Sequence, residues 1–548
     1  MSKKFLRIHP SDNVLVALTD LKAGEKLSEN EKTIVLKDAV QAKHKFAENE
    51  LKPEDEILMY GVVVGKALST IPVGGAIGTH NVKHKSNSFA GRSGTFQWNA
   101  PDVSRWKEKK FLGYHRADGQ VGTANYWVVL PLVFCENRNV NVIREAFEEG
   151  LGFSKKNTYK EFVKELVKLY RDGKTDTIQS LNISQSISES SAKIFKNIDG
   201  IKFLTHEGGC GGTRQDSEAL CALLAGYINN PNVAGATVLS LGCQNAQVSI
   251  LQEKLAQINP NFKKPLIVLE QQKEGTELEL LEQAIRKTFI GIAEANKMQR
   301  KPASLSKLVI GLECGGSDGF SGISANPSVG HASDLVVALG GTTILSEFPE
   351  LCGVEQELIN RTADDKTANR FAELMRSYSK AAEAVGSGFD MNPSPGNIKD
   401  GLITDAMKSA GAAKKGGTSP VADVLDYTEY VRRPGLNLLC TPGNDVESTT
   451  AMAGSGATVM LFTTGLGTPT GNPIAQVIKV SSNTKLAQKM SDIIDVDCGP
   501  VISGEKTIEQ MGEAILDHII AVASGLIIPK AVILNQDDFI PWKRGVSL

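Results

Sequence analysis

Hydrophobic and polar residues alternate along this chain in two different patterns. Up to about residue 80, short apolar runs such as VLVAL and EILMYGVVV are separated by turn-forming segments such as KAGEK and KPEDE. This pattern predicts a small antiparallel β module. From residue 111 onward, apolar runs of strand length alternate with stretches of helical spacing at 216–228, 276–299 and 364–384. The alternation of strands and helices predicts an α/β body built mainly on parallel sheet.

The length of 548 residues exceeds what a single hydrophobic core usually supports, so we expect several domains. The polar, Gly/Ser-rich segment KHKSNSFAGRSG follows the β module, and KPASLSK separates a long helix from a new strand. We therefore predict a β-rich domain at 1–95, a linker at 96–110, and two α/β domains at 111–303 and 304–548.

Four of the predicted strands run into cysteines. They are WVVLPLVFC, IKFLTHEGGC, ATVLSLGC and LVIGLEC, which end at Cys135, Cys210, Cys243 and Cys314. The carboxyl ends of parallel strands lie along one edge of a sheet, where open α/β folds bind ligands. This arrangement favours a soft-metal or thiolate site, and the alternative is four separately buried cysteines. Cys221 differs, because it sits inside an apolar helical run and is expected to pack.

Composition narrows the class of protein. A net charge of −2 gives no electrostatic reason to expect nucleic acid or a membrane surface as a partner. The N-terminal segment lacks the apolar region of a secretory signal, and no run reaches the roughly 18 apolar residues of a membrane span. We expect a cytoplasmic protein with mostly reduced cysteines. No CxxC pair, GxGxxG or GxxxxGK[ST] motif occurs, which weakens structural-zinc and nucleotide-binding interpretations.

Several long segments carry a family resemblance, namely RADGQVGTAN, THEGGCG, LECGGSDGFSGISANPSVG and LFTTGLGTPTGN. Through them the chain resembles, over nearly its whole length, the sugar-acid dehydratases that include altronate and galactarate dehydratases. The resemblance implies a hydro-lyase that acts on a sugar acid with Fe(II). We also expect that Mn(II) can substitute for Fe(II) and that the chain forms a homo-oligomer, namely a dimer.

Two shorter segments, AIGTHNV and TPGND, are similar to the altronate branch of that family. The expected reaction is removal of water from D-altronate to give 2-keto-3-deoxy-D-gluconate, a step in hexuronate degradation. Galactarate dehydration is the alternative within the class. A thiol- or metal-binding oxidoreductase is a more distant alternative, and the missing CxxC pair counts against it.

Such an elimination needs a Lewis acid, a proton acceptor and groups that neutralise a carboxylate. The candidate metal ligands are the four strand-end cysteines, and the sequence leaves open mononuclear iron or an iron–sulfur cluster. The candidate catalytic residues are His206, His80, Asp318 and Glu313. Against these roles, a turn aspartate is more often a cap, and a lone histidine is usually structural.

The candidate substrate-binding residues are Arg116, Arg138, Asn397, Thr464 and Asn472. The two arginines suit a bidentate carboxylate clamp, although an isolated arginine more often forms a surface salt bridge. The other three lie in Gly-rich turns that offer hydrogen bonds to hydroxyl groups, and plain tight turns are an equally good interpretation.

Overall fold

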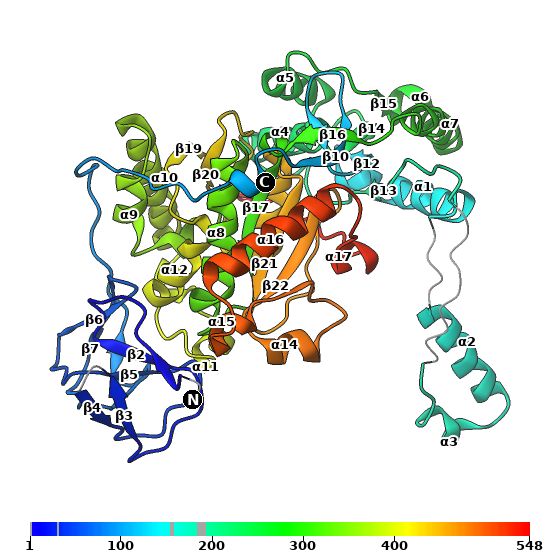
Figure 1. Ribbon diagram of the computed structural model, residues 1–548. Helices are drawn as coiled ribbons and strands as arrows, with labels where there is room; N and C mark the ends of the chain where they lie inside the picture. The colour runs from blue at the N-terminus through cyan, green and yellow to red at the C-terminus, as the bar shows by residue number, and fades with distance from the viewer. Residues whose placement is uncertain (1–2, 30–31, 154–157, 184–192, 548) are drawn as a thin grey trace.

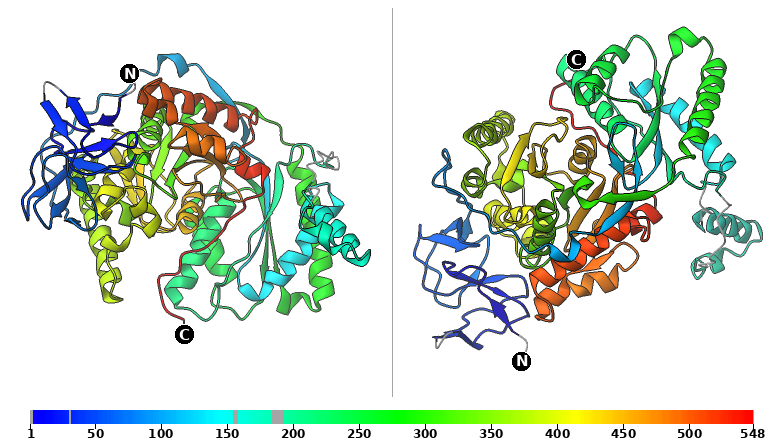
Figure 2. Two further views of the ribbon diagram at one scale, coloured as in Figure 1. Left: turned by 90° about the horizontal axis from the view of Figure 1, so that it is seen from below. Right: turned by 45° about the horizontal axis from the view of Figure 1, so that its top comes forward.

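The computed structural model describes residues 3–29, 32–153, 158–183 and 193–547 (Figures 1 and 2). The N-terminal domain is made of short antiparallel strands in three small sheets, ordered β1-β2-β5-β8, β3-β4 and β6-β7-β9. The strands are β1 (Phe5–Leu6), β2 (Val14–Ala17), β3 (Lys26–Glu29), β4 (Lys32–Val35), β5 (Lys45–Ala47), β6 (Glu56–Met59), β7 (Val62–Ala67), β8 (Ala76–Ile77) and β9 (Val82–Lys83). The predicted antiparallel β module is confirmed.

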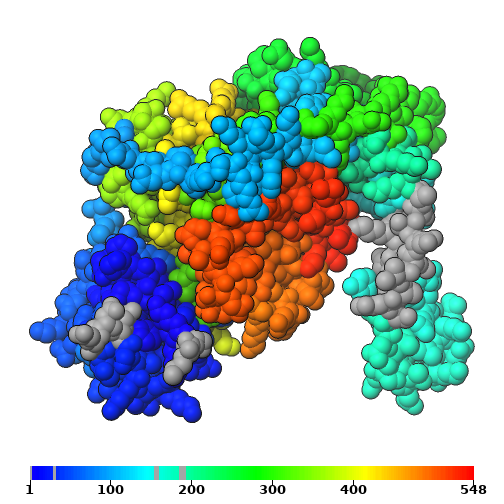
Figure 3. Space-filling model, viewed as in Figure 1, coloured from blue at the N-terminus to red at the C-terminus, as the bar shows by residue number. Residues whose placement is uncertain are grey.

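The segment after β9 runs across the surface of the C-terminal domain toward the middle domain (Figures 1 and 3). It contains the short 3-10 helix η1 (Ser104–Trp106). The indole of Trp98 donates a hydrogen bond to the Thr418 hydroxyl (3.2 Å), and that of Trp106 donates to the Asp517 carboxylate (2.9 Å). These contacts attach the predicted linker to the body of the protein.

The middle domain is built on a parallel sheet ordered β13-β12-β14-β15. Its strands are β12 (Tyr126–Pro131), β13 (Gly200–Phe203), β14 (Val233–Ser240) and β15 (Leu266–Glu270). Its helices are η2 (Phe134–Glu136), α1 (Asn137–Gly150), α4 (Arg214–Asn229), α5 (Val248–Ile258), α6 (Gln271–Glu274) and α7 (Glu277–Ala295). Helices α2 (Thr158–Arg171) and α3 (Thr175–Ile178) stand apart from the body (Figure 3). An antiparallel sheet ordered β11-β10-β16 joins the start and end of this domain, with β10 (Lys110–His115), β11 (Val121–Gly122) and β16 (Lys301–Ser304).

The C-terminal domain contains a seven-stranded sheet in which every pairing is parallel, ordered β19-β20-β18-β17-β21-β22-β23. The strands are β17 (Val309–Cys314), β18 (Thr342–Leu345), β19 (Val421–Leu425), β20 (Gly435–Leu439), β21 (Val459–Thr464), β22 (Gln476–Ser481) and β23 (Val496–Asp497). From β17 the chain continues to β18 and β20 on one side and then to β21 and β22 on the other. This reversal makes the carboxyl end of β17 a topological switch point, where open α/β sheets bind ligands.

Helices cover both faces of the seven-stranded sheet, which confirms the predicted α/β class (Figures 1 and 2). The α-helices are α8 (Ala325–Ala338), α9 (Glu355–Asn360), α10 (Asp365–Ala384), α11 (Pro395–Lys399), α12 (Asp405–Ala412), α13 (Asp445–Gly454), α14 (Thr484–Lys489), α15 (Gly499–Ser503), α16 (Ile508–Ala523) and α17 (Lys530–Ile533). The 3-10 helices are η3 (Leu305–Lys307), η4 (Ser321–Ile323), η5 (Phe348–Leu351), η6 (Phe389–Met391) and η7 (Ala413–Gly416).

The three helices predicted from apolar spacing are present as α4, α7 and α10. Thr276 caps α7 in a reciprocal capping box with Glu279. At α4 the cap is Thr213, whose hydroxyl accepts from the Asp216 backbone N–H. Within the described ranges, the helices fall short of the length and apolar character that crossing a membrane requires.

Candidate active site

Charged side chains gather at the carboxyl edge of the seven-stranded sheet, around the switch point at β17. We call this group the buried charge cluster. Its members are Glu313, Glu347, Glu350, Asp405, Lys415 and Lys479, which are buried, and Lys408 and Asp445, which are half-buried. They come from the ends of β17 and β18, from η5, α12 and η7, from the start of α13, and from β22. Because buried charges are rare unless they are paired or used, this concentration makes the sheet edge the candidate functional site.

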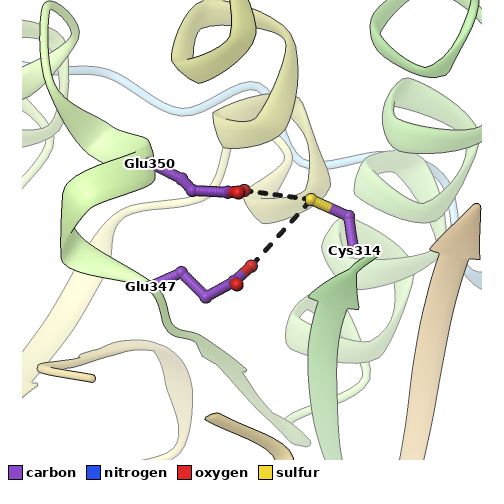
Figure 4. A group of neighbouring side chains, drawn as sticks. All are labelled: Cys314, Glu347 and Glu350. Carbon is purple, nitrogen blue, oxygen red and sulfur yellow. Dashed lines mark hydrogen bonds between the residues drawn. The ribbon is translucent and has the colours of Figure 1, made fainter. Parts of the chain in front are cut away.

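At the centre of the cluster the Cys314 thiol lies between Glu347 and Glu350 (Figure 4), and Lys415 also contacts it. The Lys415 ammonium donates to Cys314 Sγ at 2.6 Å, and Cys314 Sγ lies 3.1 Å from Glu350 Oε2 and 3.9 Å from Glu347 Oε2. Lys408 Nζ contacts Glu350 Oε1 at 2.6 Å. Two ammonium groups therefore meet two carboxylates in a space closed to solvent.

Glu347 has the most unusual position in the cluster. Its backbone is left-handed (φ 64°), a conformation that costs free energy for a non-glycine residue and is concentrated at functional sites. Its Oε1 atom is buried and has no hydrogen-bond partner in the part of the chain that is described. One ligand atom each from Glu313, Glu347 and Asp445 lie within 4.8 Å of one another, as do ligand atoms of Cys314, Glu347 and Glu350. Glu347 is therefore common to both possible cation-binding groups.

Burial sets the protonation of these carboxyl groups. It raises the pKa of Glu313 to about 7. Burial together with the negative charges of Glu313 and Glu350 raises the pKa of Glu347 well above its ordinary value. Burial also acts to raise the pKa of Glu350, but Lys408 and Lys415 outweigh it and hold that pKa at about 2. Burial raises the pKa of Asp405 well above its ordinary value, and the negative charge of Glu350 adds to this rise. The cluster thus combines ionised and protonated acids.

Lys479 differs from the other two lysines of the cluster in its pKa and in its contacts. It is buried on β22, burial lowers its pKa to about 7, and its Nζ has no hydrogen-bond partner within the described ranges. Glu313, Phe462 and Lys479 are in register across β17, β21 and β22, so their side chains share one face of the sheet. The Nζ atom lies 3.2 Å from the centroid of the Phe462 ring. A neutral amine in this place is suited to accept a proton.

The N-terminal domain contacts the segment 399–406, which leads into α12. Lys43 Nζ lies 3.0 Å from Asp318 Oδ2 and 2.7 Å from Asp400 Oδ1. The buried Lys45 ammonium donates to the Gly401 carbonyl (2.5 Å), and the Thr404 hydroxyl donates to the Val64 carbonyl (2.6 Å). Because α12 carries Asp405 and Lys408, the N-terminal domain positions one wall of the buried charge cluster.

Two of the predicted catalytic residues, Asp318 and His206, form hydrogen bonds with neighbouring residues. Asp318 Oδ1 accepts hydrogen bonds from the backbone and hydroxyl of Ser321 and from the Ser482 hydroxyl, and Oδ2 faces Lys43. His206 is buried, donates from Nε2 to the Pro131 carbonyl (2.9 Å), and accepts at Nδ1 from the Gly208 N–H (3.1 Å). Through these contacts both side chains stabilise turns.

The remaining predicted catalytic residues lie in different surroundings. Glu313 belongs to the buried charge cluster. His80 is exposed in the turn after β8. The neighbouring histidines instead contact the C-terminal domain: His44 Nε2 lies 2.9 Å from the Lys399 carbonyl oxygen, and His84 Nδ1 accepts from the Ala406 N–H at 3.4 Å. The N-terminal domain therefore faces the site with residues other than His80.

The two predicted arginine clamps have protein partners. The buried Arg116 guanidinium donates to the Pro231 and Ala124 carbonyls and to the Asn125 side chain. The exposed Arg138 pairs with Glu277 at 2.6 Å on the surface. Neither guanidinium lies at the buried charge cluster, because both residues belong to the middle domain.

The three predicted turn residues also stabilise local structure. Asn397 completes a capping box at α11 and donates to the Ser317 carbonyl (2.8 Å). The Thr464 hydroxyl accepts from the Gly467 and Thr468 N–H groups. The Asn472 side chain accepts from the Ile474 and Ala475 N–H groups. All three residues therefore agree with the alternative interpretation of the sequence, in which these segments are plain tight turns.

The predicted set of four cysteine ligands needs a correction. Cys314 is buried at the end of β17 in the seven-stranded sheet, among carboxylates and Lys415. Cys135, Cys210 and Cys243 are exposed and follow β12, β13 and β14 in the other parallel sheet. The sequence pattern located each cysteine at a strand end correctly, but the strands belong to two separate sheets.

Known protein families match this chain along nearly its whole length. A model of the altronate/galactarate dehydratase SAF domain matches residues 3–85, and one of the D-galactarate dehydratase/altronate hydrolase second domain matches residues 113–296. A model of the D-galactarate/altronate dehydratase C-terminal region matches residues 305–547. Altronate dehydratases of Escherichia coli (strain K12) and Bacillus subtilis (strain 168) are 33% and 34% identical to it, over 100% of both chains in each case. The chain belongs to the altronate/galactarate dehydratase family.

A galactarate dehydratase (L-threo-forming) of Escherichia coli (strain K12) is 29% identical over 95% of this chain and 93% of its own length. The chain is therefore a hydro-lyase of the sugar-acid class. The predicted family and enzyme class are confirmed.

Most of the buried charge cluster was missed from the sequence. Glu347 and Glu350 follow the apolar strand in ILSEFPE, so the strand-end rule that found the cysteines would have found them as well. Lys479 interrupts the apolar strand QVIKVS. A charged residue inside a buried strand is unusual, so this position could have been singled out from the sequence. Asp405, Lys408 and Lys415 lie on helices, and only the folded chain brings them to the sheet edge.

Proposed function

We propose that this enzyme removes water from D-altronate to give 2-keto-3-deoxy-D-gluconate in hexuronate degradation, and that the chemistry takes place at the buried charge cluster. The choice of altronate as substrate rests on the full-length match to two altronate dehydratases. Their sequences are more similar to this chain than that of the galactarate dehydratase is. The observation that supports the location is a set of buried acid and amine groups without hydrogen-bond partners among the described residues, at a topological switch point.

Fe(II), with Mn(II) as a substitute, fits the carboxyl groups of Glu313, Glu347 and Asp445. Their oxygen atoms lie within 4.8 Å of one another, Glu347 Oε1 has no partner among the described residues, and the cluster has five carboxyl groups but three lysines. Carboxylates suit Mn(II) and Fe(II). The set that contains Cys314 fits a cation less well, because the Lys415 ammonium already lies 2.6 Å from its sulfur. When bound, the ion supplies a Lewis acid for the oxygen atoms of the substrate.

In this proposal the residues of the chain bind the acid and move its protons. Lys408 and Lys415 neutralise the substrate carboxylate, and the neutral amine of Lys479 accepts the proton from C2. The C3–O bond breaks, and Asp405, whose pKa is raised, donates a proton to the departing hydroxyl so that it leaves as water. The C2–C3 enol that remains tautomerises to the 2-keto-3-deoxy acid. In this proposal the N-terminal domain and the segment 399–406 move apart to admit the substrate, because most residues of the cluster are buried.

The proposal is tested by assaying 2-keto-3-deoxy acid formation anaerobically from a panel of aldonates and aldarates, with Fe(II) or Mn(II) added. We expect turnover of altronate and little of galactarate. The reverse preference would support galactarate dehydration, the second candidate. Turnover at the full rate after removal of metal by a chelator would exclude the metal-assisted mechanism.

A further inference from the structure

Three cysteines follow neighbouring strands of the middle-domain sheet, which is a different sheet from that of the buried charge cluster. Cys135 follows β12, Cys210 follows β13 and Cys243 follows β14. These strands are neighbours in the order β13-β12-β14, and both pairings are parallel. The three cysteines are exposed, whereas the other five cysteines of the chain are buried or half-buried.

The turns that carry these thiols are hydrogen-bonded to one another. The Phe134 N–H, next to Cys135, donates to the Gly208 carbonyl at 3.1 Å. The Ala246 N–H, three residues after Cys243, donates to the Gly209 carbonyl at 3.0 Å. The turn that leads to Cys210 is therefore held directly between the two other cysteine-bearing turns.

Gly209 and His206 fix this turn. Gly209 has a left-handed backbone (φ 98°), and a Cβ at this position would lie 2.2 Å from the Leu132 carbonyl oxygen, so only glycine fits. The two ring nitrogens of His206 join the Pro131 carbonyl at the end of β12 to the Gly208 N–H. The Asn137 side chain donates to the His206 carbonyl at 2.9 Å. The backbone of the turn that leads to Cys210 is thus fixed by these contacts.

Free cysteine is among the most buried residue types, so three exposed thiols on one sheet edge need a reason. Thiolates are soft ligands that select zinc, copper(I) or iron–sulfur clusters. Structural zinc sites use four ligands, commonly from closely spaced pairs, and this chain has no CxxC motif. A cavity of about 280 Å³ opens beside Cys210, lined also by His206, Ser217, Phe539 and Lys543. Of the three cysteines, Cys210 lines this cavity, so a group bound at that thiol is open to the cavity on one side.

We propose that Cys135, Cys210 and Cys243 bind an iron–sulfur cluster, with one iron that has no cysteine ligand and faces the cavity beside Cys210. Iron–sulfur clusters are held by cysteine thiolates, and three of them leave one position of a four-iron cluster free. The inference is independent of the mononuclear metal site at the buried charge cluster, because it uses different residues in a different domain.

The full-length protein is purified without oxygen, incubated with Fe(II), sulfide and a thiol reductant, and desalted. We expect about four acid-labile sulfide ions per chain and about four iron ions beyond the one proposed at the buried charge cluster, with a broad visible absorption that bleaches on reduction. Cys135→Ser, Cys210→Ser and Cys243→Ser are each expected to lose most of the sulfide and the absorption. Cys221→Ala is the matched control, because Cys221 is buried in α4 just after the Cys210 turn and should leave both unchanged.

Two outcomes would overturn the inference. One is wild-type protein that takes up no sulfide, whether it is metal-free or holds only zinc. The other is a visible absorption that survives all three serine substitutions in variants whose melting temperature matches wild type. Glu347→Gln separates this inference from the proposed function, because it should keep the absorption and lose altronate turnover.

Discussion

The ammonium of Lys415 lies 2.6 Å from the sulfur of Cys314, and both side chains are almost completely buried. The lysine comes from η7 and the cysteine from the end of β17, 101 residues apart. Burial alone would lower the pKa of Lys415, but Cys314, Glu347 and Glu350 outweigh it and raise that pKa, so the lysine stays charged. Lys415 is thus the counter-ion that allows acidic groups to be buried at this sheet edge.

Replacing that counter-ion should destabilise the protein. In Lys415→Met, the ionised carboxylate of Glu350 loses a cationic partner in a buried site, and removal of one member of a buried ion pair typically costs about 3–5 kcal/mol. The free energy of unfolding of the C-terminal domain, measured in urea, should fall by an amount of this order. Lys414→Met is the control, because Lys414 is the neighbouring, more exposed lysine. Equal stability of the two variants would contradict the role of Lys415.

Glu347→Gln should weaken metal binding. The substitution removes a carboxylate shared by both possible cation-binding groups while it keeps the side-chain shape. Loss of groups that support a metal ligand already costs about 10–100-fold in affinity, and loss of a ligand should reach the upper end of that range or beyond. Fe(II) and Mn(II) affinity can be measured by equilibrium dialysis. Glu357→Gln, at an exposed glutamate of α9, should bind both ions as wild type does; a similar loss there would argue against the site.

Lys479→Met should abolish most turnover without unfolding the sheet. Positioned acid–base groups typically contribute about 10²–10⁴-fold to rate, so kcat should fall by that factor with little change in KM. Exchange of the C2 proton of altronate with solvent deuterium, followed by NMR, reports the proton-transfer step directly. The exposed Lys485 gives the matched variant Lys485→Met, which should exchange normally. Undiminished exchange in Lys479→Met would assign the base to another residue.

Lys45 should make stability depend on pH. Burial lowers its pKa to about 7 in the folded protein, from an ordinary value of 10.5. Between these two values the unfolded chain binds more protons than the folded protein, so the free energy of unfolding should rise with pH from about 7 to 10.5 and be insensitive to this group below pH 7. In Lys45→Met this contribution to the rise should be missing. Urea unfolding across this pH range, with the exposed Lys52→Met as control, measures the difference.

Lys43→Met should lower turnover through the contact between domains. It removes the ammonium that joins Asp318 and Asp400, next to the segment that leads into α12. We expect a roughly tenfold lower kcat, equivalent to about 1.4 kcal/mol, with unchanged metal content. His80→Ala changes an exposed residue of the same domain and should behave as wild type. A larger loss in His80→Ala than in Lys43→Met would restore the histidine as the catalytic group of this domain.

The α/β class, the antiparallel N-terminal module and the strand ends that carry chemistry can all be predicted from the amino-acid sequence. These features follow from local patterns: the period of the apolar residues, the turn residues between them, and cysteines or acids placed directly after buried strands. Glu313 was identified in this way, and Glu347 and Glu350 follow the same rule after the next strand of the sheet. The motifs around Cys210 and Cys314 are also sufficient to indicate the family.

Which strand ends meet is settled by the folded chain alone. Cys314 follows a strand just as Cys135, Cys210 and Cys243 do, but β17 pairs with β18 and β21 in a separate sheet, so its thiol lies among carboxylates. Strand order depends on long-range pairing, which local sequence does not encode. The same holds for Lys408, Lys415 and Lys479, because a lysine's role depends on the charges that folding brings within a few ångströms and on the water that it removes.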